Sequence, residues 1–181
     1  MILDKIKAAG KKLLFWQSDK WRYGEVSHFT IAKYIIVALI AVFVVVSVCS
    51  NVKSTKSFEE VKSALEAVVD TQKLQAEGRK ELQRYYGLNE SEYDGVMLYQ
   101  ALSGMSAEEL LLVKVSDSSK LQTVREAMEE RKESRANDFS GYAPEETALV
   151  ENSIITVKGD FILFVISEDA KMYDQTFRGS L

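Results

Sequence analysis

The chain has 181 residues, of which 46% are hydrophobic and 28% are charged, so its composition excludes both a disordered chain and a protein built mainly of membrane helices. Seven basic and three acidic residues stand up to Lys33, whereas sixteen basic and twenty-four acidic residues follow it. The two parts therefore carry net charges of +4 and −8, and the acidic balance of the longer part argues against nucleic acid as a partner.

Residues 1–30 form a basic segment that also contains aromatic side chains and apolar residues spaced three to four apart. This spacing is typical of an amphipathic helix lying on anionic lipid, and a solvated cytoplasmic tail is the alternative interpretation. A further hypothesis is that the segment engages a cytoplasmic partner, which would make the protein a transmembrane regulator.

An apolar run follows this segment. Sixteen consecutive residues from Tyr34 to Cys49 carry no charge, and with their neighbours they approach the roughly 20 residues that a helix needs to cross a bilayer. We therefore predict a transmembrane helix over residues 31–50, with Lys33 near enough to its end to reach the lipid headgroups. A buried strand or core helix is the alternative interpretation of the run.

The flanks of the run predict its orientation. Basic residues are more numerous before the run than just after it, so the positive-inside rule keeps residues 1–30 in the cytoplasm and exports the C-terminal part. The expected location is the cell membrane, with a single pass, an extracytoplasmic C-terminal domain and membrane lipid as one partner. The predicted anchors at the membrane interface are Trp16, Trp21, Lys33 and Tyr34.

Residues 46–49, Val-Ser-Val-Cys, leave open whether the N-terminal part of the chain is cleaved off or lipidated. They resemble a bacterial lipobox, in which Cys49 would be lipidated, but Val48 is larger than the small residue that this position requires. Cleavage by a signal peptidase after Cys49 is a second route. The preferred interpretation is an anchor that is not cleaved.

The acidic part divides into a short linker at residues 51–56 and an α+β domain at residues 57–178. Ser57 and Glu60 form a capping box, which predicts a helix from there to about residue 70. The other predicted elements, in chain order, are a helix over 79–86, strands over 96–102 and 110–115 joined by one helical turn, a helix over 118–139, a short helix at Pro144, strands over 154–158 and 161–166, and a helix through Phe177. This order, α-α-ββα-α-ββα, predicts a mainly antiparallel four-stranded sheet packed by helices.

The predicted strand over 161–166 is apolar at all six positions, which indicates a central strand covered on both faces. The strand over 154–158 alternates in polarity and should be half-exposed. Residues 125–138 are nearly all charged after Met128, which favours a solvated, ion-paired helix face over a binding surface. The predicted core residues are Val113, Val115, Leu121, Val124, Met128, Ile155, Val157, Leu163 and Val165.

Several short motifs resemble those of a known family. They are Gly141–Glu145, Ala148–Asn152, Val157–Phe161 and Val165–Ala170, together with Tyr86–Leu88 and Glu109–Val115. Over roughly residues 57–178 the chain is similar to domain-of-unknown-function family 4358. The resemblance implies a small exported protein of Gram-positive bacteria, tethered by a lipidated cysteine or a membrane helix, and it implies no particular activity.

Groups that could carry out catalysis are scarce in the C-terminal part. His28 and Cys49 are the single histidine and cysteine of the chain, so no Ser–His or Cys–His nucleophile and no usual zinc site can be built after residue 50. The phosphate-binding patterns GxGxxG and GxxxxGK[ST] are both missing from the sequence. We therefore predict no catalytic residue, no cofactor and no metal site.

Neighbouring acids are the remaining candidates for chemistry, because paired carboxylates serve in glycoside hydrolases and clustered oxygens bind calcium. The pairs are Glu108/Glu109, Glu145/Glu146 and Glu168/Asp169. All three are expected at helix starts, where capping explains acidic residues. A recognition surface of turn and aromatic residues is favoured instead, although packing of the aromatic ring over the core is the competing interpretation. The residues of this candidate surface are Tyr86, Gly141, Tyr142 and Pro144.

Three functions follow from these features. The preferred hypothesis is a non-enzymatic binding or interaction protein of the cell envelope, whose outer domain has a protein or cell-wall partner. The alternatives are a transmembrane regulator that signals through residues 1–30 and a carboxylate-dependent envelope hydrolase.

Overall fold

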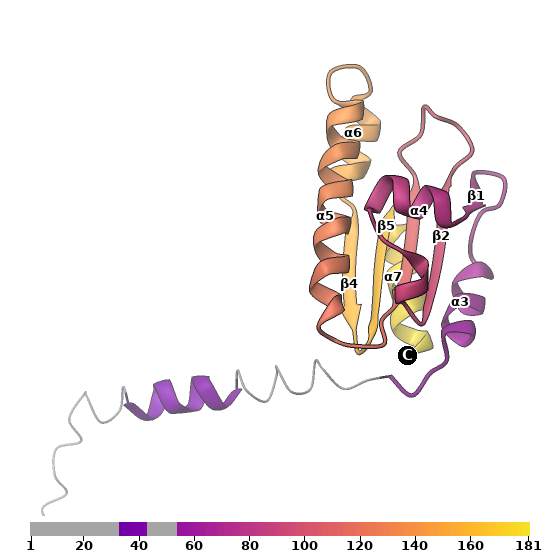
Figure 1. Cartoon of the computed structure of the whole chain (residues 1–181). Helices are drawn as coiled ribbons and strands as arrows, with labels where there is room; N and C mark the ends of the chain where they lie inside the picture. Colours follow the sequence, from indigo (N-terminus) through magenta and orange to yellow (C-terminus); the bar gives the residue numbers. More distant parts are fainter. Residues whose placement is uncertain (1–32, 43–53) are drawn as a thin grey trace, which may run out of the picture. The chain divides into compact units, whose positions relative to one another are not determined.

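The computed structural model of the chain describes residues 33–42 and 54–181, which belong to two separate compact units (Figure 1). Residues 33–42 are helical and all exposed, including seven large apolar side chains. Within the two described ranges, no helix has both the length and the apolar character needed to cross a membrane. Trp16, Trp21 and half of the predicted span over 31–50 lie outside the described residues.

The C-terminal unit is an α+β domain with six helices and a five-stranded antiparallel sheet. The strands are β1 (Leu74–Glu77), β2 (Gly95–Ala101), β3 (Glu109–Lys114), β4 (Ile154–Lys158) and β5 (Phe161–Ile166). Their order in the sheet is β1-β2-β3-β5-β4. The helices are α3 (Phe58–Glu66), α4 (Arg79–Tyr86), the 3₁₀ helix η2 (Glu90–Glu92), α5 (Lys120–Phe139), α6 (Pro144–Glu151) and α7 (Ala170–Ser180).

Helices cover both faces of the sheet (Figure 1). Because successive side chains of a strand point to opposite faces, Leu111 and Val113 of β3 pack with α4, α5 and α6, whereas Leu110 and Leu112 pack with α3 and α7. All six residues of β5 are buried, and the strand lies between β3 and β4. The prediction of a central strand covered on both faces is confirmed.

Capping groups define the helices at the N-terminal side of the domain. The amide of Glu60 donates to Ser57 Oγ (3.3 Å) and the amide of Ser57 donates to Glu60 Oε2 (2.9 Å), so the predicted capping box of α3 is present. The helix is shorter than predicted and ends at Glu66. Helix α4 has the predicted bounds, and it ends where Gly87 adopts a φ of +66°.

Two predictions about the sheet were wrong. Strand β1 makes the sheet five-stranded rather than four-stranded; it has only four residues, and only the first, Leu74, is buried. The expected helical turn at residues 106–109 is absent, because β3 already begins at Glu109. Ser106 Oγ accepts from the amide of Glu108 (3.3 Å) in a local turn instead of capping a helix.

Most of the predicted core is buried. The fully buried members are Val113, Val115, Val124, Met128, Leu163 and Val165. Leu121 and Ile155 are partly buried against the same cluster. Val157 is 40% exposed, so this prediction was wrong: β4 is an edge strand, and its position buried beside α7 is Thr156, whose hydroxyl donates to Asp174 Oδ1 (2.6 Å).

The two ends of the sheet have different neighbours. The amide of Ser54 donates to Asp160 Oδ1 (2.9 Å) at the β4–β5 turn, and Lys114 Nζ at the end of β3 donates to the carbonyl of Lys56 (2.7 Å). The β2–β3 loop joins the other end of β3, at Glu109. A six-residue strand is about 20 Å long, so residues 54–56 and the β2–β3 loop lie at opposite ends of the domain.

Candidate functional site

A cavity of about 260 Å³ opens between the β2–β3 loop, α4 and the C-terminal half of α5. Its polar and charged lining side chains include Gln100, Ser103, Glu109, Arg131, Arg135 and Asp138. We call it the arginine cavity. It combines two guanidinium groups with a buried carboxylate, which makes it the most unusual charged site in the described part of the chain.

Glu109 is the buried carboxylate of this cavity and is only 1% exposed. It accepts hydrogen bonds from Arg131 Nη2 (2.8 Å), from Arg131 Nε (3.2 Å) and from the hydroxyl of Tyr86. These charge-assisted bonds compensate the loss of solvation of the carboxylate. Burial and the negative charge of Glu109 raise the pKa of Tyr86 well above its usual range, so its hydroxyl remains a proton donor.

Arg131 is fixed by both charge and stacking. Its guanidinium carbon lies 4.3 Å from the centre of the Tyr85 ring, and its nitrogens hold Glu109. Burial disfavours the charged form of Arg131, but the hydrogen bonds to Glu109 and the negative charge of Glu109 together outweigh burial, and the pKa of Arg131 is raised. Arg131 and Glu109 therefore form a buried ion pair.

The buried positive charge of Arg135 is less well compensated than that of Arg131. Its Nη2 donates to the carbonyl of Ser106 (2.8 Å), and its guanidinium carbon lies 4.7 Å from the centre of the Phe139 ring. Its Nε lies 3.9 Å from Glu109 Oε2 and is buried without a hydrogen-bond acceptor. Burial and the positive charge of Arg131 lower the pKa of Arg135.

The sequence prediction assigned both arginines to a solvated face of α5, and for them it was wrong. Val124, Met128, Arg131, Arg135 and Phe139 are spaced by four, three, four and four residues, which places them on one side of a helix. This side faces the sheet and α4. The continuation of the apolar stripe was the signal that could have identified the arginines as inward-facing.

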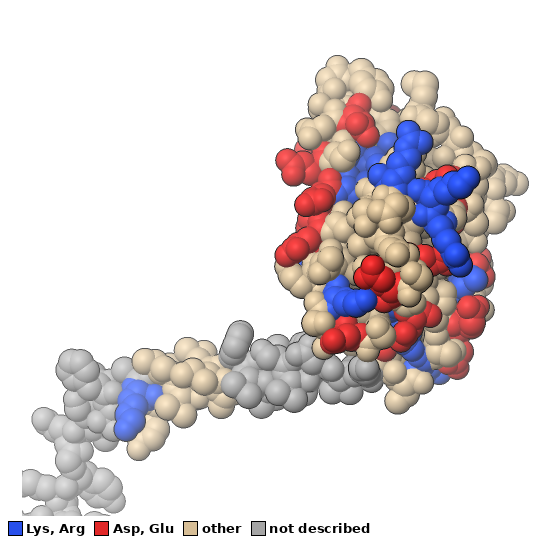
Figure 2. Space-filling model, in the orientation of Figure 1, with Lys and Arg blue, Asp and Glu red and all other residues tan. Residues whose placement is uncertain are grey.

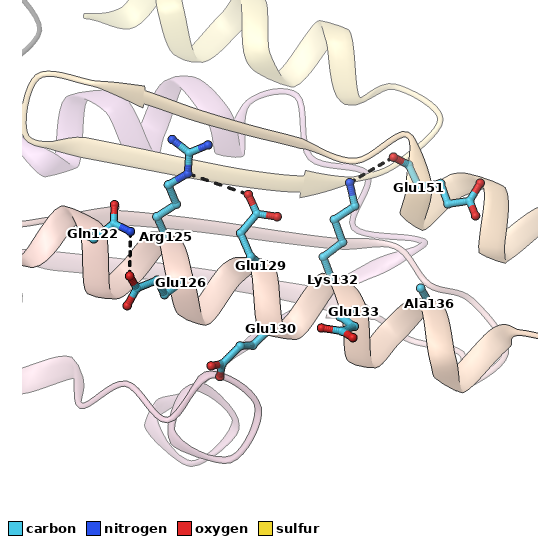
Figure 3. Close-up of a pocket in the computed structure, with 9 residues that line it drawn as sticks. All are labelled: Gln122, Arg125, Glu126, Glu129, Glu130, Lys132, Glu133, Ala136 and Glu151. Atoms are coloured by element: carbon cyan, nitrogen blue, oxygen red, sulfur yellow. Dashed lines mark hydrogen bonds and ion pairs between the residues drawn. The ribbon is translucent and has the colours of Figure 1, made fainter.

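The opposite face of α5 is solvated and paired, as predicted. Figure 3 shows side chains that line a shallow groove of about 500 Å³ and contact one another. The pairs are Gln122 Nε2 with Glu126 Oε1 (2.7 Å), Arg125 Nε with Glu129 Oε1 (3.9 Å), and Lys132 Nζ with the carbonyl of Glu151 (3.1 Å). Because these six residues pair with one another in this way, we do not treat this groove as the candidate site.

The predicted recognition residues are not all at the surface. Tyr86 lies in the core with an exposed fraction of 6% and contributes to the cavity only through Glu109. Gly141 has a φ of +87° in the loop after α5, and the exposed Pro144 begins α6. Tyr142 is 61% exposed, and its ring centre lies 5.9 Å from that of Phe139.

The neighbouring acids occupy structural positions. Glu108 and Glu109 stand at the start of β3 and not at a helix start, which corrects the prediction for this pair. Glu108 Oε1 accepts from the hydroxyl of Ser167 (3.2 Å), and Glu146 Oε2 accepts from the amide of Ala107 (2.7 Å). Among the described residues, no three His, Cys, Asp or Glu side chains are grouped so that they could hold a metal ion.

Charge is unevenly distributed around the cavity. Figure 2 shows acidic side chains along α5 and a group of basic side chains over α4. Helix α4 carries Arg79, Lys80 and Arg84, all exposed. The guanidinium carbon of Arg84 lies 5.2 Å from the centre of the Tyr85 ring, the same ring that Arg131 contacts, so this basic group adjoins the arginine cavity.

Two large apolar side chains stand exposed on the β2–β3 loop. Leu102 is 54% exposed and Met105 is 72% exposed. Their sequence neighbours Ser103, Gly104 and Ser106 line the arginine cavity. The loop that lines one side of the cavity therefore also carries exposed apolar side chains, whereas the helix side of the cavity is charged.

Comparison with known proteins gives a family but no relative of known function. The model of the family described as "Domain of unknown function (DUF4358)" matches residues 67–167, which is more than half of the chain, and confirms the resemblance seen in the sequence. No curated protein and no solved structure matches the chain. The matched range contains Glu109, Arg131 and Arg135.

Proposed function

The chain belongs to the DUF4358 domain family, and from this premise we propose that it is a non-enzymatic binding protein of the cell envelope, held by one membrane helix with its C-terminal domain outside the cytoplasm. The proposed partner is a protein or a cell-wall component that meets the end of the domain where the arginine cavity opens. The observation that carries the proposal is the exposed apolar helix at residues 33–42.

This helix supports a membrane anchor. No residue after Lys33 in the described stretch is charged, and its large apolar side chains are exposed on all sides. A helix that is apolar all round needs an apolar environment, and the uncharged sequence continues as far as Cys49. We propose that it spans the bilayer, with residues 1–30 in the cytoplasm and Tyr34 at the headgroups.

The geometry of the domain supports recognition at the end remote from residues 54–56. Residues 54–56, which follow the proposed membrane helix, contact the end of the sheet at Lys114 and Asp160. The arginine cavity, together with Leu102 and Met105, lies at the other end. Exposed large apolar side chains beside a pocket are typical of protein interaction sites.

The positions of the acids support binding rather than hydrolysis. Hydrolases need two carboxyl groups that face a cleft and are available to substrate. Glu109 is occupied by Arg131 and Tyr86, and Glu108 and Glu146 accept hydrogen bonds from Ser167 and Ala107. These acids have structural partners that account for their presence.

Cysteine labelling of intact cells tests the topology. In a Cys49→Ser background, a membrane-impermeant maleimide should label Ser140→Cys, on the exposed loop after α5, and should leave Lys12→Cys unlabelled until the cells are lysed. The reverse pattern, or protection of Ser140→Cys in intact cells, would contradict the proposed orientation.

Site-specific photocrosslinking in cells tests the recognition end. A photoreactive amino acid in place of Met105 should give a discrete crosslinked product, whereas the same group in place of Val157, which is exposed near the other end of the sheet, should not. Equal products from both positions, or products from Val157 alone, would exclude the proposed surface.

A further inference from the structure

The arginine cavity contains one more positive charge than its buried carboxylate neutralises. Arg131 and Arg135 share Glu109, which accepts hydrogen bonds from Arg131 and lies 3.9 Å from Arg135 Nε. The second acid near Arg135 is Asp138, whose side chain is 55% exposed and 3.9 Å away, so solvent screens most of its effect. The cavity is therefore suited to an additional anion.

Arg135 has hydrogen-bonding capacity to spare. A guanidinium has five N–H donors in a rigid fork, and the Nη2 bond to the carbonyl of Ser106 uses one of them. Its buried Nε has no acceptor, which is uncommon because buried polar groups are nearly always hydrogen-bonded in folded proteins. The Ser106 carbonyl and the Phe139 ring hold the group in place, so a carboxylate could pair with it without reordering the side chain.

The dimensions of the cavity limit what it can hold. A volume of about 260 Å³ lies below the range of about 300–1,000 Å³ that is typical of sites enclosing a whole small molecule. It is large enough for one acidic side chain or one terminal residue of a peptide. Gln100 and Ser103 add neutral hydrogen-bonding groups to the lining.

The surroundings of the cavity fit a protein segment better than a free anion. Leu102 and Met105 are exposed on the β2–β3 loop, whose residues Ser103, Gly104 and Ser106 line the cavity, and they offer apolar contact on the same loop. On the other side, Arg84 of the basic group on α4 contacts the same Tyr85 ring as Arg131. This local positive charge attracts an acidic segment although the domain as a whole is acidic.

We propose that the arginine cavity binds a carboxylate of a partner protein, either an acidic side chain or a C-terminus, with Arg135 as its receptor and an adjacent apolar side chain of the partner packed on Leu102 and Met105. This inference rests on the proposed function, because it specifies the chemistry of the partner that the remote end of the domain recognises. Arg131 and Glu109 act as positioning residues that hold the floor of the cavity.

The direct test uses a minimal carboxylate with one apolar side chain. N-acetyl-leucine is titrated into the full ¹⁵N-labelled chain in detergent micelles, and the arginine Nε–H resonances are followed by NMR. The resonance of Arg135 should shift and saturate, whereas N-acetyl-leucinamide, which lacks the charge, should leave it unchanged. An Arg135 resonance that does not respond to the acid in the wild-type chain would overturn the inference, and this result requires no variant.

Two matched variants of α5 test whether Arg135 binds the carboxylate. Arg135→Gln should weaken binding of N-acetyl-leucine by about tenfold or more, because a hydrogen-bonded charge pair is lost. Arg125→Gln, on the exposed face of the same helix, should bind as the wild type does. The amide spectrum shows whether Arg135→Gln folds. If it does not fold, Ser103→Ala on the exposed loop is used instead, and it should bind N-acetyl-leucine more weakly than the wild type does. Equal affinity of wild type and cavity variants would overturn the inference.

The two proposals fail in different ways. Photocrosslinking from Met105 without any response to N-acetyl-leucine would reject the carboxylate site and keep the proposed binding function. Saturable binding of the acid at Arg135 without crosslinking in cells would support the site and reject the proposed surface as the place where a cellular partner binds.

Discussion

Glu109 and Arg131 form the residue pair whose separation should cost the most stability. Glu109→Gln keeps the shape of the side chain but leaves Arg131 buried without its counter-charge. We expect a loss of about 3–5 kcal/mol in the free energy of unfolding, measured by urea denaturation. The control is Glu129→Gln, which breaks the exposed pair with Arg125 and should change stability by less than about 0.5 kcal/mol. Similar small losses for both variants would show that the buried pair is dispensable.

Asp174 should give the domain a pH-dependent contribution to stability. Burial alone would raise its pKa, but hydrogen bonds from Arg178 Nε (2.8 Å) and the Thr156 hydroxyl (2.6 Å) outweigh burial and lower it. Because the folded pKa is below the unfolded value, the stabilisation is present above the unfolded pKa of about 4 and is lost as the pH falls through the folded pKa.

Asp174→Asn should therefore lower the melting temperature at pH 7, and the difference from the wild type should shrink in strong acid. Melting curves recorded between neutral pH and about pH 2 measure this convergence. Asp94→Asn, at an exposed position, is the control for replacing an aspartate by its amide. A constant deficit for Asp174→Asn at every pH would contradict the assigned role of the carboxylate.

At the scale of elements, the end of α4 depends on one backbone conformation. Gly87 has a φ of +66°, and an added Cβ would meet nothing within 4 Å, so any loss on substitution comes from the backbone alone. Gly87→Ala should destabilise the domain by about 1 kcal/mol, measured by thermal unfolding. Gly104→Ala is the matched control, because its Cβ would also meet nothing within 4 Å and its φ is not in the left-handed region, so no loss is expected there.

The elements that the sequence predicted well are those with strong local signals. Helix α4 and strands β4 and β5 have the expected bounds, because a terminal glycine, an alternating pattern and a continuous apolar run mark them. Strand β1 was missed because only one of its four residues is buried, and pairing with β2 is what makes it a strand. Tertiary pairing of this kind leaves little trace in a local pattern.

The candidate site escaped prediction for a related reason. Arg131 and Arg135 stand among acids that indicate a solvated helix, and their inward direction follows from the stripe that they share with Val124 and Met128. Their partner Glu109 is more than twenty residues away in the sequence, at the head of a buried strand. Only the packing of α5 on the sheet brings these charges together.

For the whole molecule, the boundary of the family match differs from the boundary of the folded unit. The match begins at Ala67, but α3 precedes it and places Val61 and Leu65, both fully buried, on the sheet beside α7. Burial of two such side chains contributes about 3–6 kcal/mol. Helix α3 is therefore part of the structural domain.

Two fragments test this boundary. A fragment of residues 54–181 should unfold in one cooperative transition near the melting temperature that the domain has in the full chain, because the second compact unit contains both cores. A fragment of residues 67–181 should be destabilised by several kcal/mol or fail to unfold cooperatively. Calorimetry of both fragments measures the difference, and equal melting temperatures would show that α3 is an appendage.

The place of β5 between β3 and β4 also determines when the domain can fold during its synthesis. Strand β3 is complete by Lys114, yet on one side it has no neighbour until residues 161–166 are made. Contacts between such distant segments form late. Until β5 is available, β3 and β4 have no strand between them, and only the pairing of β5 with both completes the sheet.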